Sequence, residues 1–318
     1  MTTSGTGQPD ENVEWSSEQE RGSLFWVRIA LWGIRHLNPG CIRLFLPIIA
    51  FYYVVREKTA RHSSREFLSR IAEISGQPRP GFRASYKHLH TFAQVILDRF
   101  TLWSGRDDAF KVVYHGLDHM QELLDRGKGA ILVGAHLGSF DMLRLIARKN
   151  QIPVNVLMYV DNAQRINDAF EILDSDSMVR VISVDPDSSR LAFEVRKCVN
   201  RGEFIAVLAD RVGPNAKKRV AQFEFLGERA PFPEGPFVLA HMLGLPIILT
   251  IALRRGSSNY EVFMERISHG EAKRGRERSE AVKASMALFV SRLEYYCLNN
   301  PMQWFNFFDF WSGDRNAD

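Results

Sequence analysis

Hydrophobic residues are spaced differently in the first third of the chain and in its middle. In the first third they recur at the three- and four-residue intervals that mark one face of an α-helix. One apolar run covers residues 44–55, and the helical pattern resumes over residues 61–125, with turn-forming residues at 76–81 and 104–108. The earliest helix is marked by Leu24, Val27, Leu31 and Ile34. This part of the chain therefore predicts a helical region.

The middle of the chain consists of short apolar runs bounded by turn residues, the pattern of buried strands. Helical stretches at residues 140–149 and 191–200 lie between these runs, and another covers residues 281–297. The predicted strands are residues 130–135, 154–160, 181–184, 205–209 and 246–253. Alternation of this kind predicts an α/β fold, a mixed sheet flanked by helices.

The apolar run at residues 44–55 is shorter than the roughly 20 residues that a helix needs to cross a bilayer. Its aromatic residues and the arginines nearby favour a helix that lies in the membrane interface. The alternative is a pair of core-packed helices without lipid contact. The sequence thus predicts a tail (residues 1–23), a membrane-associating helical segment (24–58) and a catalytic domain (59–318).

Composition places the chain among folded proteins, with 45% hydrophobic and 25% charged residues. The net charge of +4 is too small to indicate nucleic-acid binding. The three cysteines are odd in number and lack CxxC spacing, which argues against a disulfide framework and favours a reducing compartment. Because residues 1–22 are polar and acidic, unlike a secretory signal, we expect a disordered tail and a body on the cytoplasmic side.

His136 is the first candidate for chemistry, because it follows a predicted strand that ends in Gly134-Ala135. In open α/β sheets ligands bind at the carboxyl ends of strands. Asp141 stands five positions later, in the first turn of a predicted helix, and Gly138 between them allows a tight turn. We therefore expect Asp141 to accept a hydrogen bond from one ring nitrogen of His136 while the other nitrogen faces substrate. The alternative is a structural histidine in a loop.

Charged residues also follow the predicted strand at residues 205–209. Asp210 and Arg211 come directly after it, and Arg211 is a candidate for binding an anionic group; the alternative is a solvated loop. The basic residues Lys217 and Lys218 further on favour a solvated loop, and the alternative is that they contact an acidic carrier protein.

Together these pieces resemble the lipid A biosynthesis acyltransferases, the lauroyl and myristoyl transferases, within the wider lysophospholipid acyltransferase superfamily. The resemblance covers roughly residues 24–311. It rests on the membrane-proximal helix, His136-x4-Asp141 after a glycine-ended strand, the block at residues 208–214, and the block at 232–236 that leads to Gly244-Leu245-Pro246.

The resemblance implies an acyltransferase at the inner membrane with its catalytic body on the cytoplasmic side. It implies His136 and Asp141 as a general-base dyad, Asp210 and Arg211 as a polar or acceptor-binding block, and Glu234 with Gly235 as the glycerophosphate-binding block. The donor is an acyl thioester on acyl carrier protein or coenzyme A, the acceptor a membrane lipid or glycolipid, and no cofactor is implied. Asp141 stands where the lipid A enzymes usually have glutamate, so lipid A, pigment lipids and other glycolipids all remain possible acceptors.

A lipid-binding protein and a hydrolase are the alternatives to an acyltransferase. A non-enzymatic lipid-binding protein could use residues 24–55 to sit on a membrane with a decayed dyad. A hydrolase is disfavoured because the sequence has no Gly-x-Ser-x-Gly elbow. A metal site is not expected, since His115 and His119 lack a third ligand in a zinc-type pattern.

Overall fold

The computed structural model describes residues 39–159, 178–184, 190–212 and 219–311. Its helices are α2 (Pro39–Arg56), α3 (Lys58–Ile74), α4 (Phe82–Trp103), α5 (Asp118–Asp125), α6 (Met142–Asn150), α8 (Arg190–Val199), α9 (Gly235–Leu243) and α10 (Gly275–Asn299), with a 3-10 turn, η2 (Asp107–Ala109). Its strands are β1 (Lys111–His115), β2 (Ile131–Gly134), β3 (Val154–Tyr159), β4 (Val179–Val184), β5 (Phe204–Leu208), β6 (Val220–Phe225), β7 (Glu228–Pro233), β8 (Ile247–Arg254) and β9 (Asn259–Ser268).

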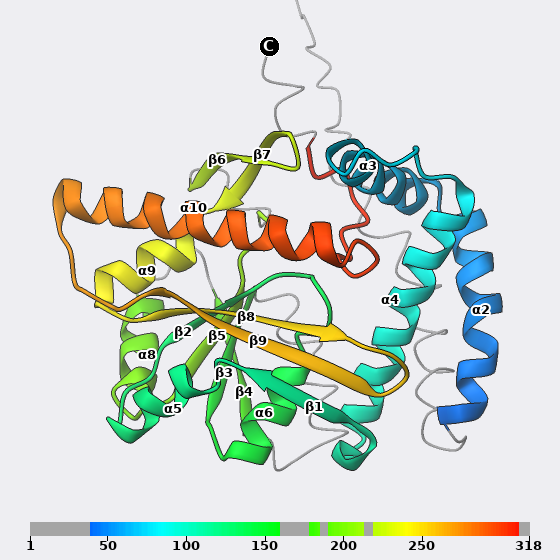
Figure 1. Cartoon of the computed structure of the whole chain (residues 1–318). Coiled ribbons are helices and arrows are strands. Elements are labelled where there is room, and N and C mark those ends of the chain that lie inside the picture. The colour runs from blue at the N-terminus through cyan, green and yellow to red at the C-terminus, as the bar shows by residue number, and fades with distance from the viewer. Residues whose placement is uncertain (1–38, 160–177, 185–189, 213–218, 312–318) are drawn as a thin grey trace, which may run out of the picture.

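The described strands form one seven-stranded sheet, in the order β1-β9-β8-β2-β5-β3-β4, and a separate β6-β7 hairpin. Strands β8, β2, β5, β3 and β4 run parallel to one another, whereas β9 is antiparallel to β8 and parallel to β1. The sheet is therefore mixed and helices flank it (Figure 1), which confirms the predicted α/β fold. The carboxyl ends of β2, β5 and β8 meet at one edge, where a ligand site is expected.

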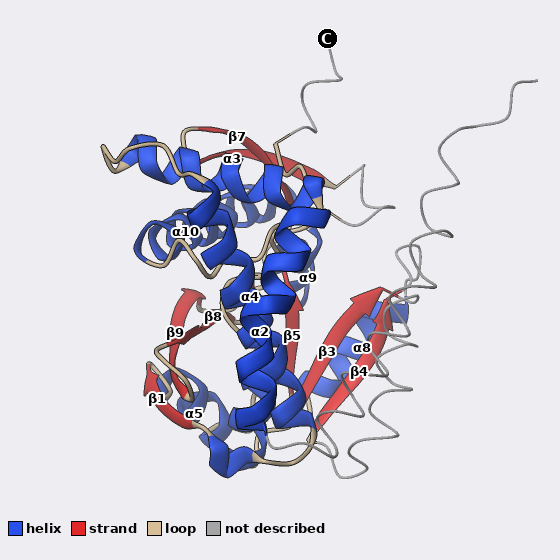
Figure 2. Cartoon of the chain, turned by 90° about the vertical axis from the view of Figure 1, so that its right-hand side faces the viewer, coloured by secondary structure: helices blue, strands red, loops and turns tan. Residues whose placement is uncertain are grey.

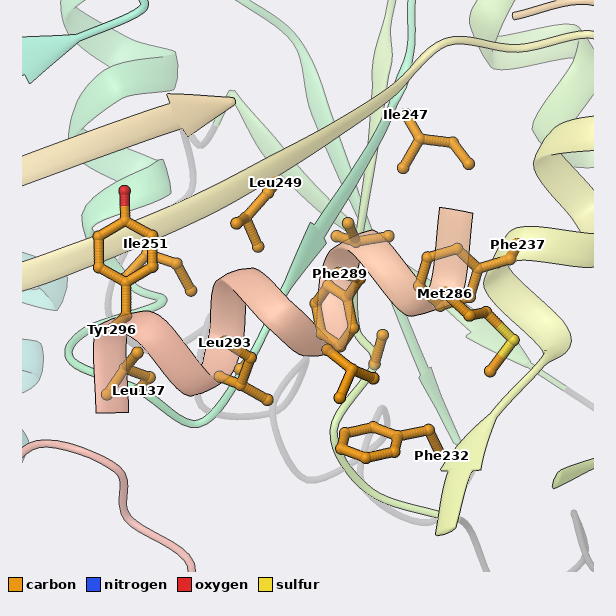
Figure 3. Close-up of a cluster of buried hydrophobic side chains, with 14 of the residues drawn as sticks. Leu137, Phe232, Phe237, Ile247, Leu249, Ile251, Met286, Phe289, Leu293 and Tyr296 are labelled. Carbon is orange, nitrogen blue, oxygen red and sulfur yellow. The ribbon is translucent and has the colours of Figure 1, made fainter. Parts of the chain in front are cut away.

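Each face of the sheet has its own hydrophobic core, because successive side chains of a strand point to opposite faces. On one face, Ile131 and Val133 of β2 pack with residues of α8, α9 and α10. On the other face, Leu132 of the same strand packs with residues of α5, α6 and the end of α4. Figure 3 shows the first core, in which Phe289 and Leu293 of α10 lie over the sheet. The central strand β2 is buried on both faces, which explains its continuous apolar sequence.

Helices α2 and α4 pack against each other beside the sheet (Figures 1 and 2). Leu46, Ala50 and Val54, spaced four residues apart, are the buried stripe of α2. Eight other large apolar residues of this helix are exposed: Leu44, Phe45, Ile48, Ile49, Phe51, Tyr52, Tyr53 and Val55. No helix in the described part of the chain is long and apolar enough to span a bilayer.

The five predicted strands all occur, within two residues at either end, but other strands were missed. β1 lies at residues 111–115, inside the region predicted to be helical, because it is a short, partly exposed edge strand whose alternation is too brief to identify. β9 was missed although its residues alternate between buried and less buried positions. The predicted tail and the helix beginning at Leu24 lie outside the described residues.

Candidate active site

The turn after β2 presents His136 at the carboxyl edge of the sheet. Gly138 in this turn has φ +69°, and a Cβ there would lie 1.9 Å from the Ala252 carbonyl oxygen of β8. Only glycine fits so close to a neighbouring strand. The amide of Ser139 then donates to the same carbonyl at 2.8 Å. The turn is thus fixed against β8, which holds His136 just beyond the central strand.

Asp210 is the residue that binds the imidazole of His136. The distance between His136 Nδ1 and Asp210 Oδ1 is 2.8 Å, and the backbone amide of His136 donates to Asp210 Oδ2, also at 2.8 Å. Trp304 Nε1 donates to the same oxygen at 3.0 Å. The Asp210 side chain is completely buried, whereas that of His136 is 29% exposed. The imidazole is therefore held at Nδ1 by a buried carboxylate, while part of the ring stays exposed.

The charge state of Asp210 follows from these contacts. Burial raises the pKa of the Asp210 carboxyl, but attraction to His136 and the hydrogen bonds that His136 donates outweigh burial, so the pKa lies below its ordinary value. An ionised Asp210 can only accept hydrogen bonds, so in the neutral form of the His136 imidazole the proton lies on Nδ1. Nε2 then carries the free lone pair. This is the arrangement in which an imidazole acts as a general base.

The prediction that Asp141 accepts a hydrogen bond from Nδ1 of His136 is wrong, because that nitrogen contacts Asp210. Asp141 precedes α6 and instead accepts from α4, with 2.6 Å between its Oδ2 and Arg99 Nε and 3.1 Å between its Oδ1 and Trp103 Nε1. The prediction rested on closeness in sequence, but the turn leads Asp141 towards α4. The catalytic roles of His136 and Asp141 themselves stay predictions.

The register of the sheet explains why Asp210 takes this place. Gly134 of β2 pairs with Leu208 of the parallel strand β5. His136 and Asp210 each stand two residues beyond that pair, so the two strands deliver them to the same point of the edge. The sequence held this signal, because both residues follow predicted strands, but only the strand order makes β2 and β5 neighbours.

Arg211 lies beside this pair and faces the C-terminal segment. Its Nη2 donates to the Phe305 carbonyl at 2.7 Å, and its guanidinium lies 5.1 Å from the centre of the Phe308 ring. Burial lowers the pKa of Arg211, and the nearby Asp210 carboxylate partly offsets that effect. In the structure this arginine contacts the Phe305 carbonyl and the Phe308 ring. Its contact with substrate stays a prediction.

The aromatic segment at residues 304–311 is a part of the site that sequence reasoning did not assign. Phe305 donates its amide to the His136 carbonyl at 2.7 Å, and the Gly138 amide donates to the Gln303 carbonyl at 2.8 Å. Leu137 and Trp304 form an isolated antiparallel bridge. The segment therefore pairs with the turn that carries His136. A dense run of aromatic residues was the only signal in the sequence.

Glu234 and Gly235 lie where the β6-β7 hairpin passes into α9. Glu234 precedes the helix, and its amide donates to the Arg219 carbonyl at 3.0 Å. Among the described residues neither makes a hydrogen bond or ion pair with His136 or Asp210, so their predicted binding role stays a prediction. Lys217 and Lys218 lie outside the described residues. Within the described part of the chain, no three His, Cys, Asp or Glu side chains are grouped to hold a metal ion.

The site so far consists of a buried carboxylate, an imidazole with one nitrogen open, and a wall of aromatic residues. A comparison with curated proteins gives no match. The family model described as bacterial lipid A biosynthesis acyltransferase, in contrast, matches residues 13–312, nearly the whole chain. The match includes every residue of the site described above. The chain therefore belongs to the bacterial lipid A biosynthesis acyltransferase family and is an acyltransferase.

Proposed function

We propose that the protein transfers a fatty acyl group from a thioester to a hydroxyl or amine of a membrane lipid or glycolipid, with His136 as general base and Asp210 as the residue that orients it. The observation that carries the proposal is the 2.8 Å contact between His136 Nδ1 and the buried Asp210 carboxylate. Family membership supports an enzyme over the alternative of a non-enzymatic lipid-binding protein.

In the proposed reaction, Nε2 of His136 takes the proton of the acceptor hydroxyl while the oxygen attacks the thioester carbonyl carbon. The carbon–sulfur bond then breaks, and the leaving thiolate receives the proton back from the imidazolium. Asp210 keeps the proton of the neutral imidazole on Nδ1 and stabilises the imidazolium while it exists. No covalent acyl-enzyme is needed.

Asp141 has a different part in this proposal. Its ion pair with Arg99 and its hydrogen bond from Trp103 join the start of α6 to α4. Both helices border the edge of the sheet where His136 stands. We therefore assign Asp141 to holding the wall of the site, and Asp210 to orienting the base.

The exposed apolar side chains of α2 support a location at a membrane surface. They include Phe45, Ile48 and Tyr52, and an apolar face of this kind binds at the interface of lipid head groups and acyl chains. A lipid acceptor would reach the enzyme from that surface. We propose peripheral association with the inner membrane and a catalytic body on its cytoplasmic side; the donor is acyl carrier protein or coenzyme A carrying the acyl thioester.

Substitution of His136 by alanine tests the proposal. The variant should lose about 10²- to 10⁴-fold in the rate of acyl transfer, because it lacks the base. Mass spectrometry of membrane lipids from cells with the wild-type protein should show a lipid species heavier by one acyl group, and cells with His136→Ala should lack it. His62→Ala, at an exposed position of α3, is the matched control and should keep the product. Full transfer by a correctly folded His136→Ala protein would contradict the mechanism.

A further inference from the structure

A pocket lies between α4 and the segment that follows α10. Its volume is about 360 Å³, within the roughly 300–1,000 Å³ that is usual for small-molecule sites. It is lined by Lys87, Thr91 and Gln94 of α4, by Arg254 of β8 and by residues 300–303. The three residues of α4 lie three or four positions apart, so they form one stripe of the helix. Neither His136 nor Asp210 lines this pocket, which is therefore distinct from the catalytic pair.

The charged side chains that line the pocket, Lys87 and Arg254, are both basic. Lys87 is exposed and makes no ion pair with another residue in the described part of the chain. Arg254 donates to the buried Asp98 carboxylate at 2.8 Å, but Asp98 also accepts from Arg43 at 3.0 Å. One carboxylate thus balances only one of these two arginines. The pocket is therefore electropositive and attracts an anion.

The hydrogen-bonding groups of the pocket also favour an anion. Gln94 Oε1 accepts from Arg254 Nη1 at 2.9 Å, so the amide N–H groups of Gln94 are what it can still offer. Lys87 adds three N–H donors. The side-chain amides of Asn300 and Gln303 already bind other protein groups through both of their polar atoms. The groups left to a ligand are therefore mainly donors.

The part of the chain that carries Lys87 holds the positive charge of the whole protein. Residues 56–90 contain eight lysines and arginines and three glutamates, a net charge of +5, whereas the entire chain has +4. Arg83 lies one turn before Lys87 on α4 and is also exposed. The remainder of the chain is therefore close to neutral, and an anionic surface is attracted mainly to this region.

This region borders the exposed apolar surface of α2 (Figures 1 and 2). Tyr86, the neighbour of Lys87, donates its hydroxyl to the Pro47 carbonyl of α2 at 3.3 Å. Its ring lies 6.4 Å from that of Phe51, a residue of α2 that is 54% exposed. The pocket is thus lined by the helix that packs against α2, and a helix with its side chains is only about 10–12 Å wide.

We propose that this pocket binds the phosphate group of a lipid head group at the membrane surface. A phosphate accepts hydrogen bonds through several oxygens and supplies the negative charge that balances Lys87. The choice of a lipid rests on the proposed function, which places α2 in a membrane interface. A head group held in the pocket fixes the orientation of the enzyme, because α2 and the pocket then contact the same leaflet.

Glycerol 3-phosphate, a soluble head group, is the first probe. It should raise the Tm of the wild-type protein, because a ligand that binds only the folded state stabilises it, whereas glycerol at the same concentration should not. Lys87→Met should weaken this binding about tenfold or more, since a hydrogen bond between charged groups is lost. Gln94→Glu keeps the acceptor for Arg254 but puts a carboxylate beside the phosphate, and it should abolish the Tm shift.

Vesicles of equal parts phosphatidylcholine and phosphatidic acid test whether the phosphate belongs to a lipid. Lys87→Met should bind them about fivefold more weakly than the wild type in co-sedimentation, the size expected for one basic residue at an anionic surface. Lys283→Met, at an exposed position of α10, is the matched control. It removes the same charge outside the pocket and should bind both probes like the wild type.

Three results would overturn the inference. One is a wild-type protein whose Tm does not respond to glycerol 3-phosphate. The second is equal binding of that probe by the wild type, Lys87→Met and Gln94→Glu, which would place the phosphate elsewhere. The third is weaker binding of the soluble probe by Lys87→Met with unchanged binding to vesicles, which would assign the pocket to a soluble phosphate such as that of coenzyme A. These measurements need no acyl donor, so a protein that binds the head group but transfers no acyl group would refute the proposed function and leave the pocket intact.

Discussion

The carboxylate of Asp210 is the most constrained group at the residue scale. It is fully buried and accepts hydrogen bonds from the amide and the imidazole of His136 and from the indole of Trp304. Its orientation is therefore set by three donors from two separate segments. Asp141, in contrast, contacts α4 and lies partly exposed. The two acids should respond differently to substitution.

Asp210→Asn should lower kcat by about 10²- to 10⁴-fold with little change in KM, because an amide cannot hold His136 in the required tautomer as a carboxylate does. Asp141→Asn keeps a side chain of the same shape and should cost less. Steady-state kinetics of acyl transfer would compare the two, with circular dichroism as the check on folding. A larger loss of kcat in Asp141→Asn than in Asp210→Asn would restore Asp141 as the orienting acid.

At the scale of single elements, α2 is an apolar helix that buries only one narrow stripe. Its exposed apolar side chains include Phe45, Ile48 and Tyr52, and Arg56 lies in its last turn. This distribution is typical of helices that lie in the membrane interface, which is the role proposed for α2.

Replacing Phe45 and Ile48 together by glutamate should therefore reduce binding to anionic vesicles at least tenfold, because two charges would have to enter the apolar interface. Co-sedimentation with vesicles measures this binding. Phe193→Glu is the control, since Phe193 is an equally exposed aromatic residue on α8. If the double variant binds vesicles as well as the wild type, α2 is not the membrane-binding element.

His88 joins three elements and makes their association depend on pH. Its Nδ1 lies 3.0 Å from Ser64 Oγ of α3, and its Nε2 lies 2.9 Å from the Trp304 carbonyl. Burial lowers the pKa of His88 to about 4, and the hydrogen bond to Trp304 offsets only part of that effect. In the unfolded chain the pKa is about 6.5. Between these values the unfolded state binds more protons than the folded state.

The contribution of His88 to stability is therefore complete above about pH 6.5 and decreases as the pH falls towards 4. A shift of this size corresponds to about 3 kcal/mol in the free energy of unfolding. We expect a His88→Gln variant to lose stability less steeply than the wild type between pH 6.5 and 4. Urea unfolding at several pH values measures both slopes. Equal slopes for the two proteins would show that His88 does not titrate as proposed.

For the whole molecule, Asp98 of α4 connects the helical region to the sheet. Its buried carboxylate accepts from Arg43 of α2 at 3.0 Å, from Arg254 of β8 at 2.8 Å and from Tyr260 of β9 at 2.9 Å. The amide of Arg254 in turn donates to Gln303, next to the segment that pairs with the His136 turn. One carboxylate thus links the apolar helix α2 to the neighbourhood of the active site.

Asp98→Ala should reduce the free energy of unfolding by about 3–5 kcal/mol, because Arg254 would stay buried without its counter-charge. Glu261→Ala is the control, since it removes the exposed ion pair with Arg255 and should cost about 0–1 kcal/mol. Guanidinium chloride unfolding of the three proteins provides the comparison. A loss at Asp98 no larger than that at Glu261 would contradict the role of Asp98 as the connecting residue.

The sequence by itself determined the elements whose pattern is local. Apolar runs predicted β2 and β5 because both strands are buried on two faces, and glycine with a polar residue at the strand end predicted where His136 would stand. The order of the strands in the sheet is not local. Only the tertiary structure placed β5 beside β2, which brought Asp210 to His136 and left Asp141 to α4. Likewise, the C-terminal segment pairs with the His136 turn through contacts across more than 160 residues, a distance over which periodicity carries no information.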